Sequence, residues 1–392
     1  MKISVVDPWC FTPPYNRELC AALAAIGHEV TLIGQHHGDG ESLTTKASSA
    51  VATLGLFTAA PDWLPRSLAL VVKGLQHVRG MCRLYARLRS HPPDVIHFQW
   101  LPLPLIDALF VPLLRRIAPV VLTIHDSNPY NGAGPWLLRA GNMLAIRCCD
   151  HLIVHNRLSE RRMIERGLPA KRIHRIAHGL LNQHEAADRM TDNDRVRFLQ
   201  FGKIKDYKGV DILLKAIARL DPECRKRCHV SIVGRAYIDT APLIRLVERH
   251  DLRGTVDLRF DFVSDTDMAL LFEAADFLVF PYRGIDTSGV LMAAIARGIP
   301  VVASDIGCFA EMLSNGEEGV LVPPGDSEAL AGALASLIRS PETRDRMRVK
   351  MQALRQRVPS WRHIAETTAA VYELAQMPPA SKPVRAVSSN IV

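Results

Sequence analysis

The 392-residue sequence has no hydrophobic run long enough to span a membrane as a helix. Such a helix needs about 20 consecutive apolar residues, and the longest candidate, 101–114, is interrupted by three prolines and an aspartate. Met1 and Lys2 lead directly into the strand-like run Ile3–Asp7, which differs from a secretory leader. The eight cysteines are scattered, without the spacing of a disulfide framework. We therefore expect reduced thiols and a cytoplasmic protein.

The sequence also lacks a signature for a metal or a dinucleotide cofactor. The turn 8–14 contains no glycine, whereas a dinucleotide fingerprint requires glycines there for close approach to the pyrophosphate. Cys224, Cys228 and His229 have a loose zinc-like spacing, but no second pair completes a site. Asp265 and Asp267 precede a predicted helix, where Ser264 or Asp265 is more simply an N-cap. No metal and no cofactor are expected.

Acidic residues are fewer than basic residues. The chain has 40 acidic and 48 basic residues, a net charge of +8, so an anionic partner is expected. The segment 62–91 holds six basic residues against one acidic residue, interleaved with apolar ones. This pattern is typical of an amphipathic helix on an anionic membrane surface, and equally of a solvated helix face. Because no nucleic-acid motif is present, no nucleic-acid partner is expected.

Strand-like and helix-like segments alternate along the chain. The strand-like runs are mostly apolar, at 2–7, 29–33, 95–98, 120–124, 151–154, 197–201, 229–233, 256–260, 277–280 and 300–303. Helix-like segments include 16–26, 209–220, 266–275 and 289–297. The alternation predicts parallel sheets covered on both faces, and the polar stretch 182–195 divides it in two. We therefore predict an α/β protein of two doubly wound domains, with ligands bound at the carboxyl ends of the strands.

A lysine-rich turn in the second half of the chain is the most informative segment. Gly202 and Lys203 follow a predicted strand, and Lys208 and Gly209 precede a predicted helix. Two ammonium groups beside the free N–H groups of a helix N-terminus favour a diphosphate. Surface lysines at a helix start are also common, so the turn alone leaves that interpretation open.

The order of these features resembles the retaining glycosyltransferases of family four, which have the GT-B fold of two Rossmann-like domains facing a central cleft. The resemblance covers about residues 1–375 and is most specific in the C-terminal half. Its motifs are the lysine turn 202–211, the strand exit 233–234, and the segments 276–282, 298–304, 319–326, 27–30 and 123–126.

The resemblance implies a division of the chain into parts. Residues 1–181 would form the acceptor-side domain, and 182–358 the nucleotide-sugar domain. Residues 359–376 would form a helix that crosses back to the first domain. The proline-containing tail 377–392 is expected to be disordered.

The resemblance also assigns roles to individual residues. The catalytic set is His125, Lys203 and Lys208, with Lys203 standing where arginine is usual. His125 has the alternative role of a structural residue at a strand end. The donor-binding set is Gly202, Arg283, Asp286, Thr287, Ser288, Gly289 and Glu311. The acceptor-side set is Tyr15, Trp100 and Asp126.

The sequence departs from the family at the donor loop, residues 283–289. The family usually carries two glutamates eight positions apart, which align here with Ile285 and Ala293. Their absence argues against a double-displacement mechanism, and leaves Thr287, Ser288 and Gly289 at a helix N-terminus for the departing phosphate. The Ser-Gly-Val loop and the pair Gln99-Trp100 resemble an exopolysaccharide branch of the family.

The resemblance therefore implies a metal-independent retaining hexosyltransferase. It would move a sugar from a nucleotide diphosphate sugar to a glycan, or to a polyprenyl-diphosphate-linked acceptor, in bacterial surface or exopolysaccharide synthesis. The basic segment 62–91 would hold it on the inner face of the cytoplasmic membrane. Two alternatives remain open: a non-catalytic GT-B subunit that supports an active partner, and a GT-B sugar-nucleotide epimerase or hydrolase.

Overall fold

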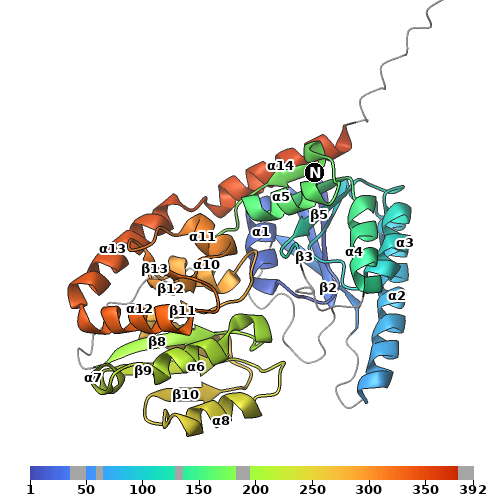
Figure 1. Cartoon of the computed structure of the whole chain (residues 1–392). Coiled ribbons are helices and arrows are strands. Elements are labelled where there is room, and N and C mark those ends of the chain that lie inside the picture. The colour runs from blue at the N-terminus through green and yellow to red at the C-terminus, as the bar shows by residue number, and fades with distance from the viewer. Residues whose placement is uncertain (36–49, 59–64, 129–135, 182–194, 378–392) are drawn as a thin grey trace, which may run out of the picture.

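The computed structural model describes residues 1–35, 50–58, 65–128, 136–181 and 195–377. Within these residues the chain forms two parallel sheets, each covered by helices on both faces (Figure 1). The seven-stranded sheet has the order β3-β2-β1-β4-β5-β6-β7, and the six-stranded sheet has the order β10-β9-β8-β11-β12-β13. This confirms the predicted α/β fold of two doubly wound domains.

The N-terminal domain contains the seven-stranded sheet. Its strands are β1 (Lys2–Asp7), β2 (Glu29–Gln35), β3 (Val51–Phe57), β4 (Val95–Phe98), β5 (Val120–Ile124), β6 (His151–Val154) and β7 (Ile173–Arg175). Its helices are α1 (Pro13–Ala25), α2 (Arg66–Ser90), α3 (Pro104–Leu114), α4 (Trp136–Cys148) and α5 (Arg157–Glu165). The side chains of β4, β5 and most of β1 are buried, as expected for central strands covered on both faces.

The C-terminal domain contains the six-stranded sheet. Its strands are β8 (Val196–Phe201), β9 (Cys228–Val233), β10 (Val256–Arg259), β11 (Phe277–Phe280), β12 (Val301–Ser304) and β13 (Gly319–Val322). Its helices are α6 (Val210–Ala218), α7 (Pro222–Lys226), α8 (Ala241–Arg249), α9 (Asp265–Ala274), α10 (Gly289–Ala296), α11 (Gly307–Met312), α12 (Ser327–Arg339) and α13 (Pro341–Arg357). The Ser264 hydroxyl accepts the Asp267 N–H at 3.1 Å, which confirms the predicted N-cap of α9.

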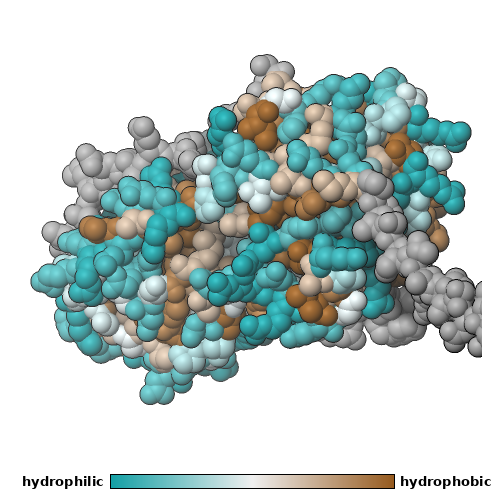
Figure 2. Space-filling view, turned by 90° about the horizontal axis from the view of Figure 1, so that it is seen from above, coloured by the Kyte–Doolittle hydropathy of each residue, from teal (hydrophilic) through white to brown (hydrophobic). Residues whose placement is uncertain are grey.

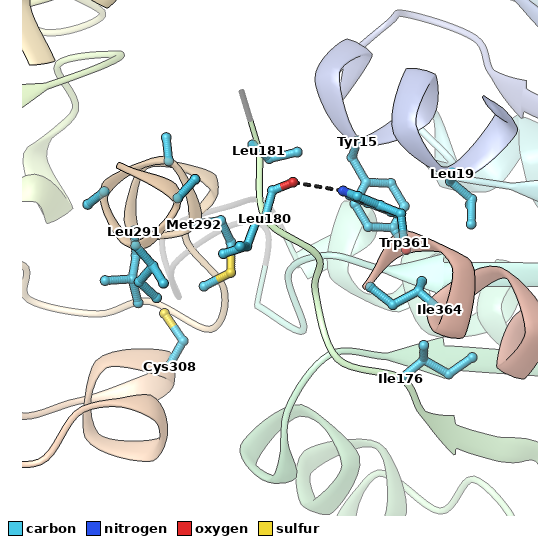
Figure 3. Packing of buried hydrophobic residues seen from close by; sticks show 14 of the residues in the cluster. Tyr15, Leu19, Ile176, Leu180, Leu181, Leu291, Met292, Cys308, Trp361 and Ile364 are labelled. Carbon is cyan, nitrogen blue, oxygen red and sulfur yellow. Dashed lines mark hydrogen bonds between the residues drawn. The ribbon is translucent and has the colours of Figure 1, made fainter. Parts of the chain in front are cut away.

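The last helix, α14 (Trp361–Gln376), runs back over the N-terminal domain and packs against α1 (Figure 1). The Tyr372 hydroxyl lies 2.6 Å from His97 Nδ1 on β4. Trp361 Nε1 donates to the carbonyl of Leu180 at 2.7 Å. Figure 3 shows Leu180 between the Tyr15–Trp361 group and Met292 of α10, so one hydrophobic cluster joins the two domains.

The surface seen from above in Figure 2 is mainly hydrophilic, with hydrophobic residues in small separate groups. In the parts of the chain that the structure describes, no helix combines the length and hydrophobicity needed to cross a bilayer. The predicted polar joint, apart from its last residue, and the predicted disordered tail, apart from its first, lie outside the described residues.

Candidate functional site

A cleft of about 660 Å³ lies between the two domains. It opens where the carboxyl ends of β1, β4 and β5 face those of β8 and β11, at the points where each strand order reverses. Nine of the residues predicted for the site line this cleft: Tyr15, Trp100, His125, Asp126, Gly202, Lys203, Lys208, Thr287 and Gly289. Arg283, Asp286, Ser288 and Glu311 are not among its lining residues.

The lysine turn forms the donor-domain side of the cleft. Lys208 is 6% exposed, and its Nζ donates to the Phe201 carbonyl at 3.1 Å and lies 5.2 Å from the centre of the Tyr282 ring. Burial, with smaller effects from the charges of Lys205 and Lys203, lowers the pKa of Lys208 to about 7. This buried ammonium, at a cleft wall, lacks a carboxylate partner among the described residues and suits a phosphate.

The shape of the turn depends on Gly209. Its φ is +63°, and a Cβ built there would lie 1.9 Å from the Pro281 carbonyl oxygen. Only glycine combines this left-handed conformation with so close an approach. The start of α6 therefore lies against Pro281, directly after β11 and beside the donor loop.

Two further residues of the turn line the cleft, although they were not predicted from the sequence. Lys205 adds a third ammonium group, and Tyr207 adds an aromatic wall. The spacing of Lys203, Lys205 and Lys208 within six residues was the available signal for Lys205.

The donor loop supplies hydroxyl and backbone groups. The Thr287 hydroxyl accepts a hydrogen bond from Asn156 Nδ2 at 3.1 Å. The Ser288 hydroxyl accepts the Leu291 N–H at 3.2 Å and so caps α10. Ile285 and Ala293, which align with the family's two glutamates, both line the cleft as apolar side chains. Among the described lining residues, Asp126 is the one carboxylate.

Three residues predicted to bind the donor have other partners. Both carboxylate oxygens of Asp211 accept from Arg283 Nη2 at 2.8 Å. Both oxygens of Glu311 accept the N–H of Arg157, at 3.0 and 2.9 Å. Asp286 is 3% exposed and pairs with Arg162 of α5. These three side chains have partners and are not among the residues that line the cleft, so their contact with a donor stays a prediction.

His125 lies at the bottom of the N-terminal side of the cleft. Its Nε2 is 3.0 Å from Gln99 Oε1, its Nδ1 is 3.1 Å from His155 Nε2, and the Trp100 ring stacks on it at 5.5 Å. Burial, then the neighbouring His155, holds the pKa of His125 well below its ordinary value. His125 is therefore a neutral hydrogen-bonding group at the cleft wall.

Asp126 and Tyr15 flank His125. Burial and the charge of Asp286 raise the pKa of Asp126 to about 6, against the opposing effect of Arg162 and Lys205. Tyr15 is almost fully buried, and its ring meets that of His125 edge-on at 4.8 Å. Asp126 is thus the titratable group of this side, whereas Tyr15 mainly supports the histidine.

Comparison with known proteins agrees with this arrangement. The family described as "Glycosyl transferases group 1" matches residues 195–340, and the "Glycosyl transferase 4-like domain" matches residues 13–179. The chain therefore belongs to the GT4-like glycosyltransferases of the GT-B fold.

Two of the curated relatives are distant in sequence but match most of the chain. Glycogen synthase of Mycobacterium tuberculosis is 27% identical, with 91% of this chain and 89% of that protein covered. Alpha-D-kanosaminyltransferase of Streptomyces kanamyceticus is 25% identical, with coverages of 75% and 78%. Among solved structures, Anabaena HepE in complex with UDP and glucose has a TM-score of 0.75 at 20% identity, covering 95% of this chain and 99% of that chain. Sucrose-phosphate synthase from Thermosynechococcus elongatus has a TM-score of 0.76 at 20% identity, with coverages of 95% and 98%.

Proposed function

We propose that this glycosyltransferase is a retaining, metal-independent hexosyltransferase that uses a nucleotide diphosphate sugar and extends a glycan. The observation that carries the proposal is the buried Lys208 ammonium on one wall of the cleft, opposite His125 and Asp126 on the other. The lysine turn would hold the donor's diphosphate. The N-terminal wall would hold the transferred sugar and the acceptor.

The charges that develop during the reaction support a mechanism in which the protein stabilises the leaving group. Cleavage of the sugar–phosphate bond leaves a nucleoside diphosphate and an oxocarbenium-like sugar, and preorganised positive groups at the departing oxygens lower the barrier. Lys203, Lys205 and Lys208, with the N–H groups of 287–289, would supply this stabilisation. Because Ile285 and Ala293 are apolar, no donor-loop carboxylate faces the sugar within the described lining. We therefore propose that the departing phosphate takes the acceptor's proton on the same face of the sugar.

A nucleotide-sugar turnover assay without an added acceptor tests the activity. UDP-, GDP- and ADP-glucose would be supplied in turn, with UDP-glucose first because HepE is solved with UDP-glucose. We expect slow release of nucleoside diphosphate from one donor, with water as acceptor and α-glucose as the first anomer seen by proton NMR. β-Glucose as the first anomer would contradict retention.

The same assay separates the alternatives. The apolar Ile285 and Ala293 at the cleft wall favour a non-catalytic subunit as the second candidate. Absence of both turnover and nucleotide binding would support it. Rapid hydrolysis that no glycan accelerates, or conversion of the sugar without release, would support the hydrolase or the epimerase.

We also propose that the acceptor is a polyprenyl-diphosphate-linked glycan of surface or exopolysaccharide synthesis, reached from the membrane surface through α2. Leu68, Val71 and Leu75 of this helix are exposed, Leu75 by 67%. Arg79 and Arg83 are exposed further along it. Exposed apolar side chains beside basic ones suit an anionic bilayer surface.

Sedimentation with vesicles tests this surface. Vesicles containing phosphatidylglycerol should carry the protein down at low salt, and uncharged vesicles should not. The triple variant Arg79→Gln, Arg83→Gln, Arg87→Gln should lose most of this binding, at about 1 kcal/mol per charge. The control variant loses the same number of charges in the C-terminal domain, at Arg245, Arg249 and Arg253. Unchanged sedimentation of the α2 variant would remove the membrane claim.

A further inference from the structure

The donor loop of one domain is joined to the other domain through the carboxylate of Asp286. Its Oδ2 accepts the Ser127 N–H at 2.6 Å and the Ser159 hydroxyl at 3.3 Å. Its Oδ1 forms an ion pair with Arg162. Ser127 follows β5, and Ser159 and Arg162 lie on α5, so all three partners belong to the N-terminal domain.

The start of α5 adds further contacts across the same junction. Asn156 caps α5 by accepting the Ser159 N–H at 2.8 Å, and its Nδ2 donates to the Asp286 carbonyl at 2.8 Å and to the Thr287 hydroxyl at 3.1 Å. The Arg157 N–H donates to Glu311 of α11. Figure 1 shows α5 beside α11 at this junction.

These contacts connect the two walls of the cleft. Thr287, which follows Asp286, lines the donor side, and Asp126, which precedes Ser127, lines the acceptor side. Because Asp286 bonds to Ser127, its carboxylate links the residue before Thr287 to the residue after Asp126. Arg162 also donates to the Ser127 hydroxyl at 3.2 Å, so Asp286, Ser127 and Arg162 are each bonded to the other two.

We propose that Asp286 is a positioning residue whose bonds to Ser127 and Arg162 hold the domains closed and set the distance between donor loop and acceptor wall. Where it concerns sugar transfer, the proposal rests on the proposed function. Asp286 does not act as a nucleophile, because both of its oxygens are buried and bonded to the other domain. A loss of closure should lower the rate more than the affinity for nucleotide, since the lysine turn lies within one domain.

The experiment compares Asp286→Ala, Asp286→Asn, Arg162→Gln and the Asp286→Asn/Arg162→Gln double variant with the wild type. Arg115→Gln is the matched control, because Arg115 pairs with Asp150 inside the N-terminal domain. Two measurements need no substrate: small-angle X-ray scattering, and hydrogen exchange of the peptide that contains Ser127. The third measurement determines kcat and KM separately, and the fourth measures nucleotide binding by calorimetry.

We expect Asp286→Ala to enlarge the radius of gyration, accelerate exchange at Ser127 and lower kcat by roughly 10- to 100-fold. Nucleotide affinity should change less than threefold. Asp286→Asn should recover part of the rate, because its amide oxygen still accepts the Ser127 N–H. The double variant should lose no more than the worse single variant, since both break the same pair.

Unchanged scattering and exchange in Asp286→Ala would overturn the proposal, as would a loss in nucleotide affinity equal to the loss in rate. Additive losses in the double variant would also contradict it. If the wild type binds no nucleotide, the proposed function fails. The two measurements without substrate still test whether Asp286 holds the domains closed.

Discussion

Replacing Lys208 with methionine is expected to weaken the binding of a nucleotide sugar by at least about 30-fold. Methionine keeps an apolar side chain over the Tyr282 ring and removes only the buried ammonium. Removal of one partner of a desolvated charge pair costs about 2–5 kcal/mol, and each 1.4 kcal/mol is about tenfold in affinity. Calorimetric titration with UDP-glucose measures the change.

Two further lysine variants make this result specific. Lys203→Met should weaken binding less than Lys208→Met, because Lys203 is exposed and its charge is screened by water. Lys226→Met, on the distant helix α7, should change nothing. Equal affinity of Lys208→Met and wild type would remove Lys208 from the donor site.

The same lysine predicts how binding depends on pH. The pKa of Lys208 is about 7 in the free protein, so the ammonium form is dominant below pH 7 and is lost as the pH rises. A diphosphate binds the ammonium form, and the affinity should therefore be about tenfold lower at pH 8 than at pH 6. A nucleotide sugar is the right ligand, because its diphosphate is esterified at both ends and does not titrate in this range. In Lys208→Met most of this dependence should disappear, leaving the smaller part that comes from Asp126, whose pKa burial raises to about 6.

Gly209→Ala is expected to have the second largest effect. Its Cβ would lie 1.9 Å from the Pro281 carbonyl oxygen at a φ of +63°. Overpacking costs about 1–3 kcal/mol and a left-handed alanine about 1–2 kcal/mol. We expect the free energy of unfolding of the C-terminal domain to fall by roughly 2–5 kcal/mol and nucleotide binding to be lost with it, because the turn and the donor loop must separate.

Denaturation in urea and nucleotide titration measure the two effects of Gly209→Ala. The matched control is Gly254→Ala in the same domain, where an added Cβ meets no atom within 4 Å. It should change stability by about 0.5 kcal/mol or less. If both variants behave alike, the close approach of the turn to Pro281 is not what shapes the site.

Much of the fold could be predicted because central parallel strands are continuous apolar runs. The segments 95–98, 120–124, 151–154 and 277–280 are strands over those same residues. Helix α1 begins at Pro13, three residues before the predicted start, because prolines suit the first turn of a helix. The edge strands β3, β7 and β13 were not predicted. The side chains of β3 are buried only at its two ends, and β7 has only three residues.

The site could be predicted only where a motif is local. The lysine turn lies within a few residues of sequence, so its spacing indicated a phosphate site. The partners of Asp286 could not be predicted, because Ser127 is 159 positions away in the sequence. The fold thus pairs this carboxylate with residues of the other domain, which the sequence does not indicate. For the same reason Glu311 was predicted near the donor, whereas its partner is Arg157 of α5.

The central claim is that the cleft between the two domains binds a nucleotide diphosphate through its buried lysine. Thermal denaturation with UDP, GDP and ADP in turn tests it most directly, because a ligand that binds the folded state raises the melting temperature by mass action. The account predicts a rise with one of the three in the wild type and a much smaller rise, or none, in Lys208→Met at the same ligand concentration. A rise of equal size in Lys208→Met, or no rise with any of the three, would contradict it.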